Sequence, residues 1–227
     1  MQNLFPNGAP LALLLALSAV IAYFCGCFNG AVIVSKYILR DDVRNHGSGN
    51  AGLTNFFRTF GGPLTFVVIL CDVLKAVAAL LIARWLMFSG YTAFISADFT
   101  AAYWDTLAKY WAGLFCLLGH MFPCMFHFKG GKGILSGGTA AIMIDWRVAV
   151  VVWGGFLILT ILTRYVSLGS LWAGASFPFV SWFCYPRPAI VLLAFLLGGL
   201  VVWQHRANIK RLLAGNENKL SFHRKKS

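Results

Sequence analysis

The stretch PLALLLALSAVIAYFCGCFNGAVIV, from Pro10 to Val34, contains no charged residue in 25 positions. As an α-helix that rises about 1.5 Å per residue, it is long enough to cross a hydrocarbon core of about 30 Å. No Lys or Arg precedes it, and polar protein follows it rather than a small-residue cleavage site. The stretch therefore predicts a first transmembrane helix and not a removable signal peptide.

The composition places the whole chain in the same class. Of its 227 residues, 59% are hydrophobic and only 11% are charged, too few to cover a soluble domain of this size. Only helices or a closed barrel satisfy backbone groups in lipid, and these apolar runs do not alternate as barrel strands do. We therefore predict one all-α integral membrane domain over residues 1–227. Its seven transmembrane helices are expected at Pro10–Val34, Phe60–Ala83, Tyr110–Phe128, Gly133–Ile144, Val148–Thr163, Tyr165–Tyr185 and Pro188–Trp203.

The basic residues set the predicted orientation. With the N-terminus outside and the C-terminus cytoplasmic, 14 of the 19 Lys and Arg residues fall in cytoplasmic segments, as the positive-inside rule requires. The fourth span is short, but without it Arg164 and the basic tail would lie opposite Lys129 and Lys132. We therefore expect a short or tilted fourth helix. The segment 85–105 is expected to form a long outer loop.

The first polar segment on the predicted cytoplasmic side is RNHGSGNAGLTNFFR, residues 44–58. Its glycines can adopt positive φ and let backbone amides approach a phosphate. A tight connector between two helices would use the same residue types, so this segment alone does not decide between the two interpretations.

Two further polar segments lie on the same predicted side. GHMFP at 119–123 and FKGGKG at 128–133 precede a helix start, which favours an anion, although a basic anchor with flexible glycines is the alternative. HRANIKRLLAGNENK at 205–219 puts His205 and Asn208 on one helix face, which a simple membrane anchor would not need. Together the three segments predict a pocket for more than one anionic group.

The net charge, the cysteines and histidines, and the charged residues inside the second span do not require a further functional site. The net charge of +12 suits an anionic leaflet and an anionic substrate, and we expect no nucleic-acid partner. The cysteines and histidines do not have the spacing of a metal site, so none is assigned. Asp72 and Lys75 lie three positions apart inside the second span, where an ion pair that orients the bundle is the expected role.

The three polar segments, in this order and between apolar spans, resemble the motifs of the PlsY family, the acyl-phosphate-dependent glycerol-3-phosphate acyltransferases of bacterial membranes. The resemblance covers about residues 26–219. It implies transfer of a fatty acyl group from acyl phosphate to glycerol 3-phosphate, giving lysophosphatidic acid and phosphate, at the cytoplasmic face of the inner membrane. It implies no cofactor or metal. The implied partners are the two substrates, membrane lipid and the peripheral enzyme that makes acyl phosphate.

The resemblance also assigns roles to residues. Glu217 is implied to be structural, and Gly26-Cys27-Phe28-Asn29 replaces the usual Gly-Ser-Ile-Pro, which favours a straighter first helix. The implied catalytic residues are Ser48, Arg58, His205 and Asn208. The implied substrate-binding residues are Gly47, Gly49, Asn50, Thr54, Asn55, His120, Lys129, Gly130, Gly131, Lys132 and Gly133.

The residues also bear on other functions. The H-x4-D signature of acyltransferases that use acyl-CoA or acyl carrier protein is absent, and so are the clustered aspartates of CDP-alcohol phosphotransferases. A transporter of phosphate esters or other anions is the alternative from another class, with Asp72 and Lys75 lining its path. Within the enzyme hypothesis, Ser48 is either a nucleophile or a hydrogen-bond donor, and His205 either a base or an orienting group.

Overall fold

The computed structural model describes residues 10–89 and 100–220, and all regular structure within these ranges is helical. This confirms the predicted all-α class. The long elements of the bundle are α1 (Leu11–Cys27), α4 (Leu64–Ser89), α5 (Ala101–Met121), α6 (Ile134–Ile144), α7 (Trp146–Thr163), α8 (Val166–Cys184) and α9 (Pro188–Gln204).

The helices form two groups, which are joined by a short central helix and by a direct contact between α5 and α9. Helices α1, α4 and α5 pack on one another, while α7, α8 and α9 form the second group. Helix α6, of only 11 residues, contacts α4 and α5 on one side and α7 and α8 on the other. The core at this junction is apolar, with Tyr110, Leu117 and Ala194 almost fully buried. The predicted short fourth helix is therefore confirmed as a short, central element.

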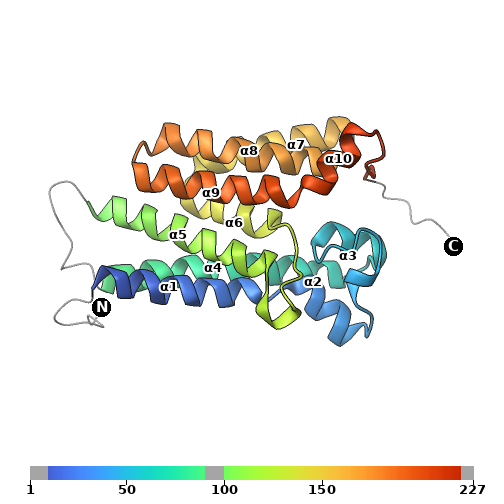
Figure 1. The fold of residues 1–227 in the computed structure, drawn as a ribbon, viewed down its shortest axis with the longest axis horizontal. Coiled ribbons are helices and arrows are strands. Elements are labelled where there is room, and N and C mark those ends of the chain that lie inside the picture. Colours follow the sequence, from blue (N-terminus) through green and yellow to red (C-terminus); the bar gives the residue numbers. More distant parts are fainter. Residues whose placement is uncertain (1–9, 90–99, 221–227) are drawn as a thin grey trace.

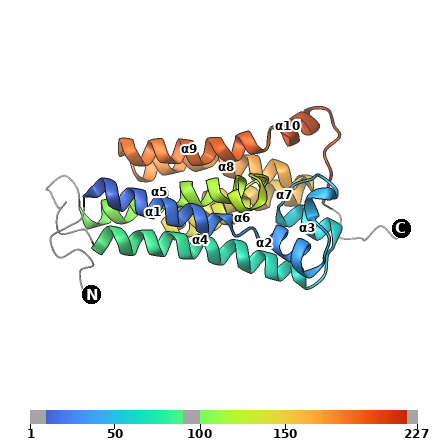
Figure 2. The ribbon, with the colours of Figure 1, turned by 60° about the horizontal axis from the view of Figure 1, so that its bottom comes forward.

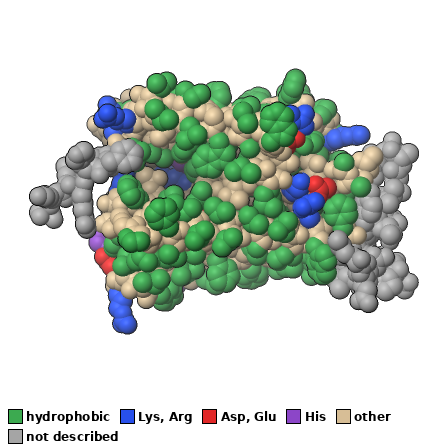
Figure 3. All heavy atoms as spheres, turned by 180° about the vertical axis from the view of Figure 1, so that it is seen from behind, with side chains coloured by type: hydrophobic (Ala, Val, Ile, Leu, Met, Phe, Trp, Pro, Cys, Tyr) green, Lys and Arg blue, Asp and Glu red, His purple; other side chains and the backbone are tan. Residues whose placement is uncertain are grey.

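The outer surface is apolar along the length of the bundle. Phe66, Leu162 and Phe183 are each at least 70% exposed, and hydrophobic side chains cover the middle of the face in Figure 3, with most Lys and Arg at its two ends. By length and hydropathy, three described helices could cross a membrane, namely α1 with its continuation to Ile38, α4 and α7; α9 with the bent α10 gives a fourth. Such a surface suits hydrocarbon rather than water.

The third span begins and ends earlier in the chain than expected. Helix α5 begins at Ala101 and not Tyr110, because Thr100 accepts a hydrogen bond from Tyr103 N and starts the helix. It ends at Met121, and the apolar residues that follow form a tight loop in which His127 and Phe128 adopt left-handed backbone angles. The end of the apolar run Tyr110–Phe128 is therefore a loop and not helix, which hydrophobicity alone could not distinguish.

The expected second span and the long outer loop also need correction. Helix α4 runs from Leu64 to Ser89 and not from Phe60 to Ala83, so it extends well into segment 85–105. Asp105 on α5 pairs with Arg84 on α4 and with Lys109, the latter at 2.7 Å. These charges interrupt the apolar pattern without ending the helices. The rest of the connection, residues 90–99, lies outside the described residues, as does the N-terminus.

The first span is not straight, contrary to the expectation from Gly26-Cys27-Phe28-Asn29. Helix α1 ends at Cys27, and Asn29 adopts an extended conformation. The Asn29 side chain accepts from Val32 N at 3.1 Å, which starts α2 (Gly30–Ile33), and donates to Ala51 O at 3.0 Å. An asparagine cap therefore breaks this helix without a proline.

The three polar segments gather at one end of the bundle. That end carries α2, the π-helix η1 (Val34–Ile38), the 3₁₀ turn η2 (Val43–Asn45), α3 (Leu53–Thr59) and α10 (Arg206–Leu213). Helix α10 bends 54° away from α9. The alternating directions of the long helices return the chain to this end before each segment, as the sequence predicted.

Candidate active site

A cavity of about 240 Å³ lies where the three polar segments meet. It takes side chains from α3, from the loop before α6, from α10 and its tail, and also from α7 and α8. The expected site residues in its lining are Ser48, Asn50, Thr54, Asn55, Arg58, His120, Lys132, Gly133, His205 and Asn208. The structure thus brings together all four implied catalytic residues, although His205 and Asn208 are far from Ser48 in sequence.

The loop that carries Ser48 is held by the side chain of Asn55. Its Oδ1 accepts from Ser48 N at 3.1 Å, and its Nδ2 is within hydrogen-bond distance of Val43 O and His46 O, both at 3.0 Å. Gly47 has a φ of 56°, which favours glycine. Asn55 lines the cavity, but its hydrogen-bonding groups are engaged by the loop, so its evident role is to place Ser48.

Lys132 lies at one end of a chain of polar side chains along the cavity wall. Its Nζ donates to Asn208 Oδ1, and Asn208 Nδ2 donates to Glu217 Oε1 at 3.2 Å. Glu217 Oε2 accepts from Arg211 Nε at 2.9 Å. Burial and the neighbouring cations Arg211 and Arg58, opposed by Glu217, together lower the pKa of Lys132 to about 8. Glu217 therefore holds Asn208 and Arg211 in place, consistent with a structural role.

Arg58, on α3, supplies a second cation to the cavity lining. Its Nη2 donates to Asn218 O at 3.1 Å, which ties the C-terminal segment over the cavity. Burial lowers the pKa of Arg58, but a guanidinium remains charged at any physiological pH. With Lys132 and Arg211, three basic side chains line the cavity, together with two carboxylates, those of Glu217 and the buried Asp72. The chemistry of this lining suits a phosphate group.

His205 follows the last residue of α9 and presents one ring nitrogen as an acceptor. Its Nδ1 lies 2.8 Å from Val201 O, and because a carbonyl only accepts, Nδ1 must carry the proton. Burial lowers the pKa of His205 to about 4, so the ring is neutral at physiological pH. Nε2 is therefore left unprotonated and able to accept a hydrogen bond from a ligand hydroxyl.

Ser48 and His205 do not form a nucleophile and base pair. No hydrogen bond joins their side chains within the described residues, and His205 Nδ1 is already used by Val201. A serine nucleophile needs an adjacent base within hydrogen-bond distance. The geometry therefore favours Ser48 as a hydrogen-bond donor to substrate.

Part of the glycine-rich loop packs against α5 instead of opening into the cavity. Gly130 N donates to Met121 O and Gly131 N donates to His120 O, both at 3.1 Å. A Cβ at Gly131 would overlap His120 Nε2. These two amides are thus not free for a phosphate, and Lys129, Gly130 and Gly131 lie outside the cavity lining, as do Gly47 and Gly49. From this loop, Lys132 and Gly133 reach the cavity.

The part of the cavity wall that the second helix group contributes was not predicted from the sequence. Trp153 and Phe156 on α7, and Ser167 and Ser170 on α8, line the cavity. Two serines three positions apart at the start of an apolar span were the available signal, because polar residues in spans often face a functional interior. The aromatic residues carried no such signal.

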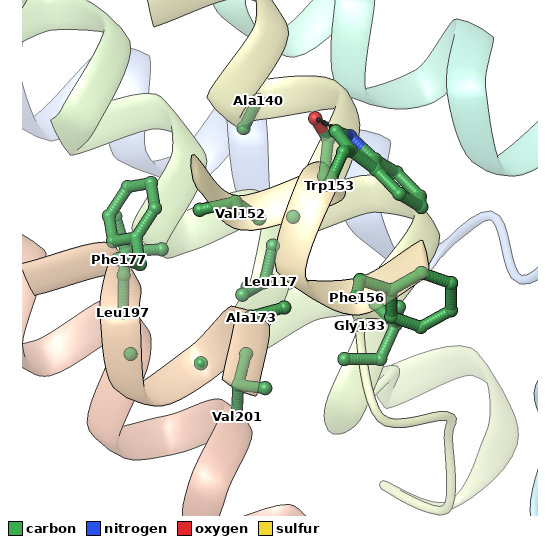
Figure 4. Close-up of a pocket in the computed structure, with 15 residues that line it drawn as sticks. Leu117, Gly133, Ala140, Val152, Trp153, Phe156, Ala173, Phe177, Leu197 and Val201 are labelled. Carbon is green, nitrogen blue, oxygen red and sulfur yellow. Dashed lines mark hydrogen bonds between the residues drawn. The ribbon is translucent and has the colours of Figure 1, made fainter. Parts of the chain in front are cut away.

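A second, smaller pocket of about 40 Å³ adjoins the cavity and is almost wholly apolar. The two share Gly133, Ile134, Trp153 and Phe156 in their linings. Figure 4 shows Leu117, Val152, Phe177, Leu197 and Val201 around this pocket, at the junction of the two helix groups. A polar, basic cavity therefore continues into an apolar space deeper in the bundle.

Comparison with known proteins agrees with this geometry. The family model described as glycerol-3-phosphate acyltransferase matches residues 16–215. Glycerol-3-phosphate acyltransferase of Thermoanaerobacter pseudethanolicus is 37% identical over 204 residues, which cover 90% of this chain and 94% of that protein. The enzyme of Thermosynechococcus vestitus is 32% identical over 209 residues, with 92% and 96% covered.

Two crystal structures of PlsY, an integral membrane glycerol 3-phosphate acyltransferase, have the same fold. The glycerol 3-phosphate form has a TM-score of 0.77 and 30% identity, and covers 91% of this chain and 96% of that one. The lysophosphatidic acid form has a TM-score of 0.74 and 29% identity, with 91% and 95% covered. The chain therefore belongs to the glycerol-3-phosphate acyltransferase family and has the fold of the integral membrane enzyme PlsY.

Proposed function

We propose that this chain transfers a fatty acyl group from acyl phosphate to glycerol 3-phosphate, giving lysophosphatidic acid and inorganic phosphate as the first acylation of phospholipid synthesis. The observation that carries the proposal is the single cavity lined by Ser48, Arg58, Lys132, His205 and Asn208. Family membership favours this enzyme over a transporter of phosphate esters or other anions.

Both substrates carry a phosphate, and the cavity is lined by cationic side chains from more than one segment of the chain. Lys132 and Arg58 stand on different segments, so they can bind phosphate oxygens from different directions. Acyl phosphate is already an activated donor, so the protein has mainly to position the acceptor hydroxyl and stabilise the developing negative charge. Ser48 and Asn208 supply neutral donors for that charge.

The hydroxyl of glycerol 3-phosphate that becomes acylated can donate a hydrogen bond to the unprotonated Nε2 of His205. Oxygen of this hydroxyl attacks the acyl carbonyl carbon, and the bond from that carbon to the phosphate oxygen breaks. The proton leaves the hydroxyl oxygen as the new ester forms. A base with a pKa of about 4 accepts this proton weakly, whereas a phosphate monoester has a second pKa of about 6. We therefore assign His205 to orienting the hydroxyl and a phosphate oxygen to taking the proton.

The fatty acyl chain has an apolar place beside the reacting atoms. The adjoining pocket between α5, α6, α7, α8 and α9 is small, so it suits the first methylenes of the chain, with the remainder in lipid. Each buried methylene contributes about 0.8 kcal/mol, which helps to anchor the donor with its phosphate in the basic cavity.

A donor comparison tests this function. Purified protein is given glycerol 3-phosphate with either acyl phosphate or acyl-CoA, in the presence of a chelator, and lysophosphatidic acid is quantified. We expect product with acyl phosphate alone. Product only with acyl-CoA would contradict the proposed donor, and phosphate-ester uptake into proteoliposomes without acyl transfer would favour the transporter.

The proposal includes seven crossings and a cytoplasmic active site in the bacterial inner membrane, near the peripheral enzyme that makes acyl phosphate. The charge distribution supports it, since the cavity end carries Lys129, Lys132 and Lys210. Cysteines at the exposed positions Lys129 and Arg147, at opposite ends of the bundle, give a test with an impermeant maleimide. We expect Arg147→Cys to react in intact cells and Lys129→Cys only after lysis. The reverse result would invert the topology.

A further inference from the structure

Three side chains form a buried polar cluster between the helix break in the first span and the cavity. Asp72 and Lys75 on α4 and His120 on α5 are each at most 4% exposed by side chain. Lys75 Nζ lies 2.6 Å from Asp72 Oδ1, 3.1 Å from Phe28 O and 2.7 Å from His120 Nδ1. An ion pair that only orients the bundle would not need the histidine.

These contacts fix the protonation of the histidine ring. A lysine ammonium has three N–H donors and no acceptor, and Lys75 has one partner for each of them. The ammonium of Lys75 forms an ion pair with Asp72 at 2.6 Å and can only donate, so His120 Nδ1 accepts the third hydrogen bond. His120 is therefore a neutral imidazole with its proton on Nε2.

The other edge of this ring meets the active-site wall. His120 lines the cavity, and its Nε2 lies so close to Gly131 that a Cβ there would overlap it. The His120 carbonyl also accepts from Gly131 N at 3.1 Å. Asp72 and His120 thus line the cavity side by side, and with Nδ1 engaged by Lys75, Nε2–H is the remaining donor of the His120 ring.

We propose that Lys75, held by Asp72, is a positioning residue that fixes the tautomer of His120, so that the Nε2–H is presented to the cavity as a neutral hydrogen-bond donor for a substrate oxygen. This rests on the proposed function. His205 has the opposite tautomer, with Nε2 as an acceptor. The cavity then contains one imidazole that donates and one that accepts, and neither adds charge beside the phosphates.

A double-mutant cycle separates positioning from a general structural role. The variant Asp72→Ala/Lys75→Met removes both charges together, so that no unpaired ion is buried. We expect it to lower kcat/KM roughly 10- to 100-fold, the cost of misorienting a ligand-binding imidazole through its supporting partner. The control, Asp105→Ala/Lys109→Met, removes an ion pair at the other end of the bundle, where Asp105 also pairs with the partly exposed Arg84, and should retain activity.

The second arm of the cycle starts from His120→Gln. The glutamine side-chain amide supplies an N–H donor near the position of Nε2, and it has no tautomer that Lys75 would need to fix. In that background the Asp72→Ala/Lys75→Met change should have little further effect, because its action passes through His120. An equal loss in both backgrounds would show a structural role and overturn the proposal. Acylation by the wild-type protein in the same assay tests the proposed function separately.

A spectroscopic measurement tests the tautomer on the wild-type protein, and a variant is used only to assign the signals. In ¹⁵N-histidine-labelled protein, protonated and bare ring nitrogens have distinct shifts, and His120→Gln assigns the His120 signals among the five histidines. We expect a bare Nδ1 and a protonated Nε2 for His120. A protonated Nδ1 in the wild type would refute the proposal, whatever the enzyme's activity.

Discussion

Replacing any one of Ser48, Arg58, His205 or Asn208 with Ala is expected to lower turnover about 100-fold or more while the bundle stays folded. These side chains line one cavity, and removing one donor from a charge-stabilising site typically costs about 2.7–4 kcal/mol of barrier. The measurement is kcat at saturating acyl phosphate and glycerol 3-phosphate, together with the melting temperature in detergent.

Asn216→Ala is the matched control for Asn208→Ala. Asn216 lies in the same C-terminal segment, but it is exposed and outside the cavity lining. It should retain turnover close to the wild type. Wild-type turnover in both Ser48→Ala and His205→Ala would show that the cavity is not the catalytic centre.

Lys132→Met is expected to lower kcat/KM for glycerol 3-phosphate roughly 10- to 100-fold, because a hydrogen bond to a charged group contributes about 1.5–3 kcal/mol. The lysine must be protonated to bind a phosphate, and its pKa is lowered to about 8. In the wild type, kcat/KM should therefore fall as the pH rises through about 8 in the free enzyme. Lys132→Arg should move this alkaline fall to higher pH.

The control for this prediction lies three residues away. Lys129 is exposed and outside the cavity lining, so Lys129→Met removes the same charge from the same loop. It should change kcat/KM little. An equal loss in Lys129→Met and Lys132→Met would mean that the loop acts through its net charge and not through contact with substrate.

The sequence predicted the class of fold well because lipid restricts the choices. The spans Gly133–Ile144, Tyr165–Tyr185 and Pro188–Trp203 differ from α6, α8 and α9 by only a residue or so at each end. The errors lie where hydrophobicity and helix formation diverge, as in the apolar loop after Met121 and the charged helix ends around Arg84 and Asp105. Hydropathy is insensitive to caps and to ion pairs between helices.

The candidate site could be predicted as far as its polar segments. The residues Ser48, Arg58, Lys132, His205 and Asn208 do share one cavity. Sequence could not show that Gly131 packs against His120 or that Asn55 holds the Ser48 loop, because both depend on which groups face each other across the bundle. On the α7 and α8 wall, Ser167 and Ser170 were a signal that could have been used, whereas Trp153 and Phe156 could not be told from packing residues.

Single-turnover rapid quench tests direct transfer in this cavity most directly. Purified protein is mixed with labelled acyl phosphate, with and without glycerol 3-phosphate, quenched over the catalytic time range and analysed by mass spectrometry. We expect lysophosphatidic acid in one phase when both substrates are present, and no acylated protein when the acceptor is omitted. An acyl adduct on Ser48 that forms and decays at catalytic rates would contradict direct transfer.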